Sequence, residues 1–173
     1  PTLLRARVLA QVMARIGPVK FAPSETSLTH ADALMAARTH GGHTLGGCMI
    51  RWRGSDIMIG REAAALDGVP PMPLSRTGSV WDRRFFVEIR KGKKAKAGLF
   101  AAPLGAAGLA QLESAGLQAP KGVPRCYLHV LPAVFDMTGL VSCPVLAPQN
   151  PVNMVAWQPG APYLRDLSAM AGW

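Results

Sequence analysis

The spacing of apolar residues changes along this chain, and that change constrains the fold more than any motif does. In the first 38 residues the apolar side chains recur every three or four positions, and from Thr44 onward they alternate with polar ones. The first spacing lines one side of a helix, and the second lines one face of a strand. We therefore predict an α+β fold, with a helical hairpin at the N-terminus followed by a small, mostly antiparallel sheet domain with short helices.

The N-terminal segment predicts two helices. Residues 2–16 place six apolar residues on one side of a helix, namely Leu4, Val8, Leu9, Val12, Met13 and Ile16. Gly17-Pro18 ends this helix, because proline cannot continue the hydrogen-bond ladder. A second helix is expected from near Ser24, a short polar residue that can cap free amide groups. It runs to Arg38, and Gly41-Gly42 ends it.

Residues 48–61 predict a hairpin with a defined register. Gly54-Ser55 forms a two-residue turn, since glycine at its first position suits type II′. This turn pairs Arg53 with Asp56 and places Ile50, Trp52, Ile57 and Ile59 on one face. A slip by one residue would scatter these apolar side chains over both faces, so turn chemistry and apolar pattern agree.

The second half of the chain predicts shorter elements. Residues 66–79 are rich in Gly, Pro and Ser and predict a loop. The alternation from Trp81 to Arg90 predicts a half-buried strand, and residues 97–102 its returning partner, so that residues 90–96 form a strand-loop-strand tip. Residues 106–115 predict a helix closed by Gly116.

The last predicted strand is Leu140–Cys143, which follows a turn at Asp136-Met137-Thr138-Gly139. Proline becomes frequent after it, so residues 148–173 are expected to form an extended or disordered tail unless their aromatic residues dock; these are Trp157, Tyr163 and Trp173. The expected boundaries are 1–42 for the helical part, 43–147 for the α+β domain and 148–173 for the tail.

The net positive charge lies entirely in the first 100 residues of the chain. Residues 1–100 carry 16 Lys and Arg against 7 Asp and Glu, whereas residues 101–173 carry 3 against 3. A one-sided basic surface attracts polyanions over a Debye length of about 8–10 Å. This favours nucleic acid as the partner, with an anionic membrane surface as the weaker alternative. No stretch reaches the roughly 18–20 apolar residues of a membrane span.

Long cationic side chains on strand faces and at the tip are the candidate RNA contacts: Arg51, Arg53, Arg83, Arg84, Arg90, Lys91, Lys93, Lys94 and Lys96. Phe86 is the one aromatic residue expected on the polar face of its strand. Because stacking on single-stranded bases needs interleaved aromatic residues, we expect contacts to the phosphate backbone rather than base readout.

Motifs for catalysis or metal binding are absent from the sequence: there is no GxxxxGK loop, GxGxxG turn, HExxH or paired CxxC. We assign no catalytic residue. His40, His43 and Cys48 have an H-x2-H-x4-C spacing that zinc could use, but no fourth ligand lies nearby. The favoured alternative is two solvent-facing histidines at a helix end.

The cysteines Cys48, Cys126 and Cys143 are odd in number and widely separated. They are expected to be reduced thiols in the core of a cytoplasmic protein, with a disulfide as the alternative.

Four segments resemble the C-terminal region of tRNA(Ile)-lysidine synthetase, of the shorter-tailed alphaproteobacterial type. The resemblance spans about residues 2–146. The segments are Thr44-Leu45-Gly46-Gly47-Cys48 with the following hairpin ending Gly60-Arg61-Glu62, Val80-Trp81-Asp82-Arg83-Arg84-Phe85, Ala102-Pro103-Leu104-Gly105, and Leu131-Pro132-Ala133-Val134-Phe135-Asp136.

The resemblance implies a role in tRNA modification. Members of that family activate the wobble cytidine of an isoleucine tRNA with ATP and let lysine displace AMP. This chemistry belongs to an N-terminal PP-loop domain with an SGGxDS motif, which this chain lacks. The chain is thus expected to be the tRNA-binding remainder, with tRNA and its own catalytic domain as partners and with no cofactor of its own.

The sequence begins at Pro1 without an initiator Met, which predicts a piece of a longer protein or a processed product. Two alternatives stay open. One is a protein-interaction or dimerisation module that uses the helix face of Val8, Val12 and Ile16. The other is a small basic enzyme of unrecognised type, which a pocket with convergent polar groups would support.

Overall fold

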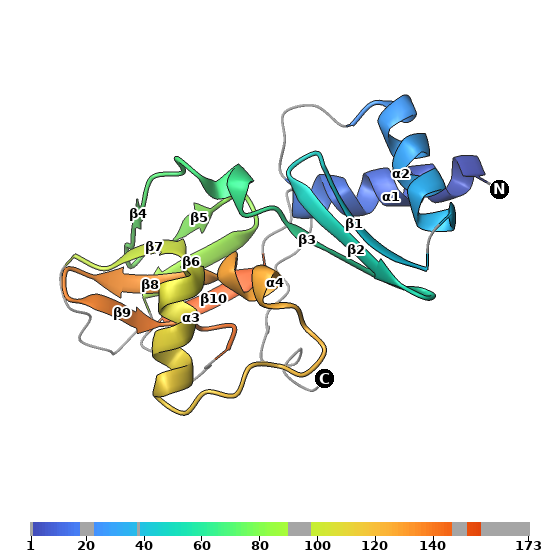
Figure 1. Ribbon diagram of the computed structural model, residues 1–173. Coiled ribbons are helices and arrows are strands. Elements are labelled where there is room, and N and C mark those ends of the chain that lie inside the picture. The colour runs from blue at the N-terminus through green and yellow to red at the C-terminus, as the bar shows by residue number, and fades with distance from the viewer. Residues whose placement is uncertain (1, 18–22, 38, 90–97, 147–151, 157–173) are drawn as a thin grey trace. The chain divides into compact units, whose positions relative to one another are not determined.

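The structure, a computed structural model, describes residues 2–17, 23–37, 39–89, 98–146 and 152–156. The chain divides into two compact units, Pro1–Asp67 and Gly68–Trp173. Each unit combines antiparallel strands with helices, which confirms the predicted α+β class (Figure 1). The first unit extends past the expected boundary at residue 42, because the first hairpin packs on the N-terminal helices rather than with the later strands.

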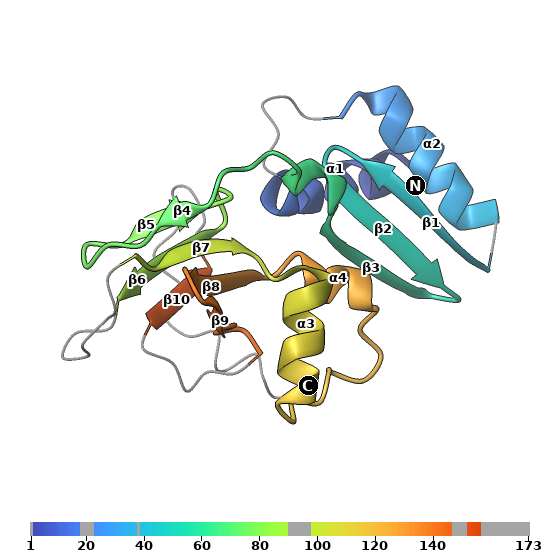
Figure 2. The same cartoon turned by 60° about the vertical axis from the view of Figure 1, so that its left-hand side comes forward.

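The first unit is a three-stranded sheet with two helices on one of its faces (Figures 1 and 2). The strand order is β1-β2-β3, and both pairs are antiparallel. Its elements are α1 (Thr2–Ile16), α2 (Glu25–Ala37), β1 (His40–Leu45), β2 (Cys48–Arg53), β3 (Asp56–Arg61) and the short 3-10 helix η1 (Ala64–Leu66). Leu9 and Met13 of α1 and Leu28 of α2 pack on Ile50 and Trp52 of β2, and these side chains form the core.

The β2–β3 hairpin has the predicted register, with Arg53 opposite Asp56 and Ile50 opposite Ile59. Gly54 has φ +60°, as the first position of a type II′ turn requires. One residue of this apolar face is not covered: Ile57 is 54% exposed. Ile57 lies on the edge strand beside the turn, outside the cluster of residues that packs on α1 and α2.

The helices begin and end where predicted, but two glycine positions have other roles. The Ser27 amide donates to Ser24 Oγ at 3.2 Å, so Ser24 caps α2. At Gly17 a Cβ would lie 2.2 Å from the Gly46 carbonyl oxygen, so glycine permits close approach of the chain there. Gly41-Gly42 does not end α2 as expected. It lies within β1, where a Cβ on Gly41 would lie 2.3 Å from the ring of Trp52.

The second unit contains two antiparallel sheets, with strand orders β10-β6-β5 and β4-β7-β8-β9. Side chains of α3 and α4 pack on the second of these sheets around Leu109, Leu128 and Ala133. Its elements are β4 (Met72–Pro73), β5 (Ser79–Trp81), β6 (Phe85–Ile89), β7 (Phe100–Pro103), α3 (Gly105–Ser114), α4 (Arg125–His129), β8 (Pro132–Asp136), β9 (Gly139–Ser142) and β10 (Val152–Ala156).

Glycine closes α3 as predicted. Gly116 has φ +95°, and the Leu117 amide donates to the Leu112 carbonyl at 3.0 Å. These two features define a Schellman motif, which satisfies carbonyl groups that the end of a helix leaves free. The turn after β8 is also confirmed, since an Asp136 carboxylate oxygen accepts a bond from the Thr138 amide at 2.7 Å.

The strands around the basic segment are paired differently from the prediction. The prediction of a continuous strand from Trp81 to Arg90 is wrong, because the chain reverses between β5 and β6. β7 pairs with β4 and β8 and not with β6, so residues 90–96 do not connect two paired strands. Residues 90–97 lie outside the described part of the chain.

Two segments expected to lack strands contain them. β4 lies inside the expected loop 66–79 and pairs with β7. β10 lies inside the Pro-rich tail and pairs antiparallel with β6. Trp157, Tyr163 and Trp173 lie outside the described residues. No helix in the described part of the chain is long and apolar enough to cross a membrane.

Candidate nucleic-acid interface

The first sheet has a face that the helices of its unit do not cover (Figures 1 and 2). Because side chains alternate along a strand, the residues between the buried ones of β2 point to this face. The register adds their partners on β1 and β3. We call this surface the outer sheet face. Its residues are His40, Gly42, Thr44, Met49, Arg51, Arg53, Asp56, Met58 and Gly60.

Arg51 and Arg53 give the outer sheet face its positive charge. Both are exposed, and as alternate residues of β2 their Cα atoms lie about 7 Å apart. Gly42 and Met58, the cross-strand neighbours of Arg51, are uncharged. Asp56 lies opposite Arg53 and offsets part of its charge.

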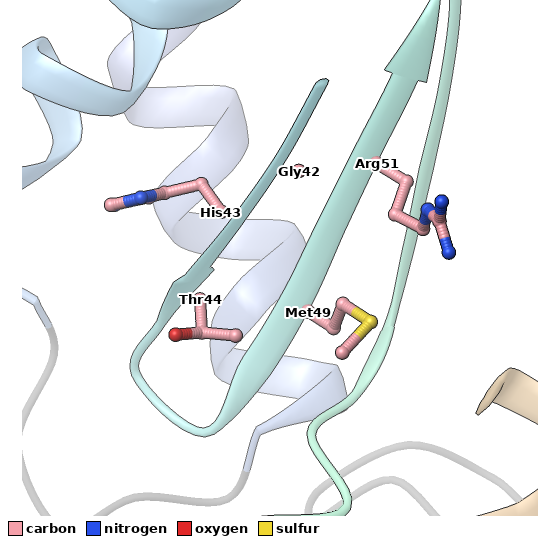
Figure 3. Close-up of a pocket in the computed structure, with 5 residues that line it drawn as sticks. All are labelled: Gly42, His43, Thr44, Met49 and Arg51. Carbon is pink, nitrogen blue, oxygen red and sulfur yellow. The ribbon is translucent and has the colours of Figure 1, made fainter. Parts of the chain in front are cut away.

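A depression of about 470 Å³ opens beside Arg51 (Figure 3). Its lining combines a cation, a hydroxyl group, a thioether and a glycine: Gly42, His43, Thr44, Met49 and Arg51. His43 and Arg51 extend away from each other in this view. The arrangement offers one exposed cation and one hydroxyl donor beside a small apolar surface, which suits a phosphate group together with its sugar.

The histidines of β1 are not arranged as a metal site. His40 and His43 are three positions apart in one strand, so their side chains leave opposite faces. His43 packs edge-on against His30 of α2, with 5.9 Å between ring centroids. Cys48 is buried, and its thiol donates to the Met13 carbonyl. The histidines therefore lie in a strand and not at the helix end that the sequence indicated. In the residues that the structure covers, no group of three possible ligands comes together.

All three cysteines are free thiols, so the disulfide alternative is wrong. Cys48 and Cys143 are buried and Cys126 is half-buried, in agreement with the expected reduced core residues. Burial raises the pKa of the Cys143 thiol to about 11. Because a nucleophilic cysteine must be a thiolate near neutral pH, Cys143 is not suited to that role.

Two of the predicted arginines of the second unit lie in its described part, and they have different environments. The Nε atom of Arg84 donates to Asp82 Oδ2 at 2.7 Å, and its guanidinium lies 4.9 Å from the ring centroid of Phe85. The Arg84 side chain is only 13% exposed, so its charge is engaged inside the hairpin. Arg83, between them, is exposed. Arg84 is therefore a structural residue in our assignment, and Arg83 stays a candidate contact.

The remaining predicted residues divide into two groups. Phe86 is half-buried, and a Cβ on Gly78 would lie 2.1 Å from its ring, so the ring packs on the backbone at Gly78, just before β5. The other five candidates lie outside the described residues: Arg90, Lys91, Lys93, Lys94 and Lys96. The structure thus brings Arg51 and Arg53 together on one face, and shows Arg83 on the other unit.

Several other basic residues stabilise the fold. Arg5 forms a bidentate ion pair with Asp32, at 2.8 and 2.9 Å, and so joins α1 to α2. Arg125 pairs with Glu113. Arg61 is buried, and its guanidinium donates to the Gly47 carbonyl at 2.9 Å. The charges of Arg5 and Arg125 are thus paired with carboxylates, although both side chains are more than half exposed, and Arg61 is buried.

The sequence reasoning missed His40, Thr44 and Met49 as residues of the outer sheet face. These residues alternate with the residues that point to the core, but this alternation is evident only when residues 40–45 are known to form a strand. Gly41-Gly42 hid that strand, because glycine pairs usually mark a break.

The glycine turn at Gly46-Gly47 has a structural explanation. Gly46 and Gly47 both have positive φ and join β1 to β2. The Gly47 carbonyl accepts hydrogen bonds from the Glu62 amide at 2.9 Å and from the Arg61 guanidinium. These bonds connect the turn between β1 and β2 to the end of β3.

No protein-family model, curated protein or solved structure matches this chain. The case for a function therefore depends on the residues themselves.

Proposed function

We propose that this chain binds tRNA through its phosphate backbone, as the non-catalytic C-terminal part of a cytoplasmic tRNA(Ile)-lysidine synthetase. The ATP-dependent attachment of lysine to the wobble cytidine would belong to the catalytic domain that this chain lacks. The observation that carries the proposal is the pair Arg51 and Arg53, both exposed on an outer sheet face that no helix of its unit covers. The resemblance across residues 2–146 supplies tRNA as the particular nucleic acid.

The chemistry of this face favours phosphate over base recognition. Arginine donates in a planar fork that matches phosphate oxygens. The face has no Trp, Tyr or Phe among its residues, so it lacks the stacking platforms that single-stranded bases need. Binding should therefore depend on the number of phosphates engaged and decrease steeply with salt.

The test is the salt dependence of binding to a tRNA(Ile) transcript, measured by fluorescence anisotropy between about 50 and 200 mM salt. The double variant R51A/R53A should weaken binding and reduce the slope of log K against log salt by about 1.4–1.8, since each phosphate contact contributes about 0.7–0.9. The matched control is R7A/R15A, which removes the same charge from exposed positions of α1. Equal losses in both variants would show diffuse attraction and contradict a defined site.

The assignment to the lysidine synthetase family has its own test, which is the reading frame upstream of Pro1. An SGGxDS motif there is expected. A different catalytic signature would leave the phosphate-binding face in place but contradict the family.

A second candidate function is protein interaction through α1. Leu4 is 60% and Val8 53% exposed on this helix, which leaves part of its predicted apolar side uncovered. Ile16 packs against the core and does not belong to the exposed surface. Self-association that is insensitive to salt, seen by sedimentation in a protein that binds no tRNA, would favour this function.

A further inference from the structure

The tip of the β5–β6 hairpin has an unusual backbone. Asp82 has φ +47° and Arg83 φ +54°, and the Arg84 amide donates to the Trp81 carbonyl at 3.0 Å. Two successive left-handed residues bridged in this way are typical of a type I′ turn, which prefers Asn-Gly or Asp-Gly. Asp82 follows that preference. Arg83 occupies the position where glycine is favoured, although a side chain there is strained.

The turn is held in place by contacts beneath it. The carboxylate of Asp82 is 5% exposed and pairs with the guanidinium of Arg84 at 2.7 Å. That guanidinium lies 4.9 Å from the ring centroid of Phe85 and 6.0 Å from that of Trp81. These contacts hold both neighbours of Arg83, so the backbone at position 83 cannot relax to an unstrained conformation without breaking them.

The side chain of Arg83 has no comparable structural role. It is exposed, and within the described residues no hydrogen bond or ion pair of this side chain is found. Since Asp82 neutralises Arg84, the net charge of the tip is the single positive charge of Arg83. A strained residue that contributes nothing to its own fold is most simply explained by what it contacts outside the fold.

We propose that Arg83 is a second, separate phosphate-binding residue for RNA, presented by a rigid turn at a cost in stability. The inference rests on the proposed function, and it adds a contact on the second compact unit to the outer sheet face of the first. Contacts on two linked units raise affinity through effective concentration, even when each one is weak. Arg84, the neighbour in sequence, is excluded from this role by its pairing with Asp82.

The experiment measures stability and binding on the same variants of the full chain. R83G and R83N remove the side chain but suit the left-handed backbone. Each is expected to raise the melting temperature by roughly 2–4 °C. Each should also weaken binding to the tRNA(Ile) transcript about three- to tenfold and reduce the salt slope by about 1. R83K keeps both the strain and a charge, and should retain most of the affinity with an unchanged melting temperature.

The matched control is K121N, which removes one exposed positive charge from the same unit and should change affinity less than about twofold. Binding by R83G equal to that of K121N would overturn the inference, and so would a lower melting temperature, since Arg83 would then support the fold. A wild-type chain that does not bind the transcript would contradict the proposed function as well. If R51A/R53A weakens binding to the transcript and R83G does not, only the role of Arg83 is contradicted.

Discussion

The β2–β3 and β5–β6 hairpins both reverse the chain within a few residues, but they meet the need for a left-handed backbone in opposite ways. In the first, Gly54 takes φ +60°, and a Cβ built on it would contact nothing within 4 Å. In the second, Asp82 and Arg83 take positive φ with side chains in place. Glycine adopts such a backbone without steric cost, whereas other residues do not.

The difference shows what stabilises each turn. The first hairpin depends on its own turn residue, and its flanking pair, Arg53 and Asp56, is exposed. The second depends on a buried ion pair and two aromatic rings packed around the turn. Because those contacts hold the backbone, the residue at the tip does not have to favour the turn and is open to selection for binding.

The largest expected effect concerns the ion pair under the second turn. Asp82→Ala leaves the buried guanidinium of Arg84 without this carboxylate and should lower the free energy of unfolding by about 3 kcal/mol. Urea denaturation followed through tryptophan fluorescence, to which the buried Trp81 contributes, measures it. Asp56→Ala, the matched change in the first hairpin, should cost no more than about 0.5 kcal/mol. Similar effects in both hairpins would remove the distinction between them.

The next effect tests the packing of the first sheet. A Cβ on Gly41 would lie 2.3 Å from the ring of Trp52, so Gly41→Ala should lower the free energy of unfolding by about 2 kcal/mol through overpacking. The control is its neighbour Gly42, where the nearest heavy atom would lie 3.7 Å away. Gly42→Ala should be neutral within about 0.5 kcal/mol. Equal effects in the two variants would mean that Trp52 does not lie on Gly41.

A smaller effect is expected at the first turn itself. Gly54→Ala should lower the free energy of unfolding by about 1 kcal/mol, because alanine is strained at positive φ and no contact compensates for it. Gly54→Asn should cost less, since asparagine tolerates this backbone. Thermal melts of the two variants measure the effects. Together with R83G they should show opposite signs in the two hairpins, and the same sign in both would contradict our description of the second turn.

The smallest effect concerns the ion pair of the first unit between the exposed Arg5 and the buried Asp32. Hydrogen bonds from Arg5 hold the pKa of Asp32 below its ordinary value of 3.8. A lowered carboxyl pKa stabilises the folded state above that ordinary value, and this stabilisation is lost as the pH falls through the folded-state pKa. Denaturation midpoints measured from about pH 5 to pH 2 should therefore fall less steeply in Asp32→Asn than in the wild type. Equal slopes would show that the pair does not contribute.

Local signals were sufficient for several parts of the fold. The register of β2–β3 follows from a glycine turn and the alternation of six residues on either side of it. The ends of α1 and α3 follow from periodicity and from Gly116. For the candidate site, the same alternation predicted that Arg51 and Arg53 face away from the core. In each case the residues that decide the structure lie within a few positions of one another.

The remaining features depend on contacts between distant segments. The Gly41-Gly42 pair lies in a strand, and the ring of Trp52 occupies the space that a Cβ on Gly41 would need; no local rule indicates either fact. The apolar alternation from Trp81 to Arg90 resembles a single strand, since nothing in it marks Asp82-Arg83 as a turn. Arg84 resembles a surface cation in the sequence, but its aromatic neighbours and Asp82 enclose it.

By itself, the sequence determined the α+β class, the first hairpin and the outward direction of Arg51 and Arg53, because period and turn chemistry act over a few residues. Tertiary structure alone decided which strands pair, where the compact units divide and which arginines are available to a partner. Burial and ion pairing depend on what surrounds a side chain in space. Arg83 and Arg84 are adjacent in the sequence, yet one is exposed and the other is enclosed.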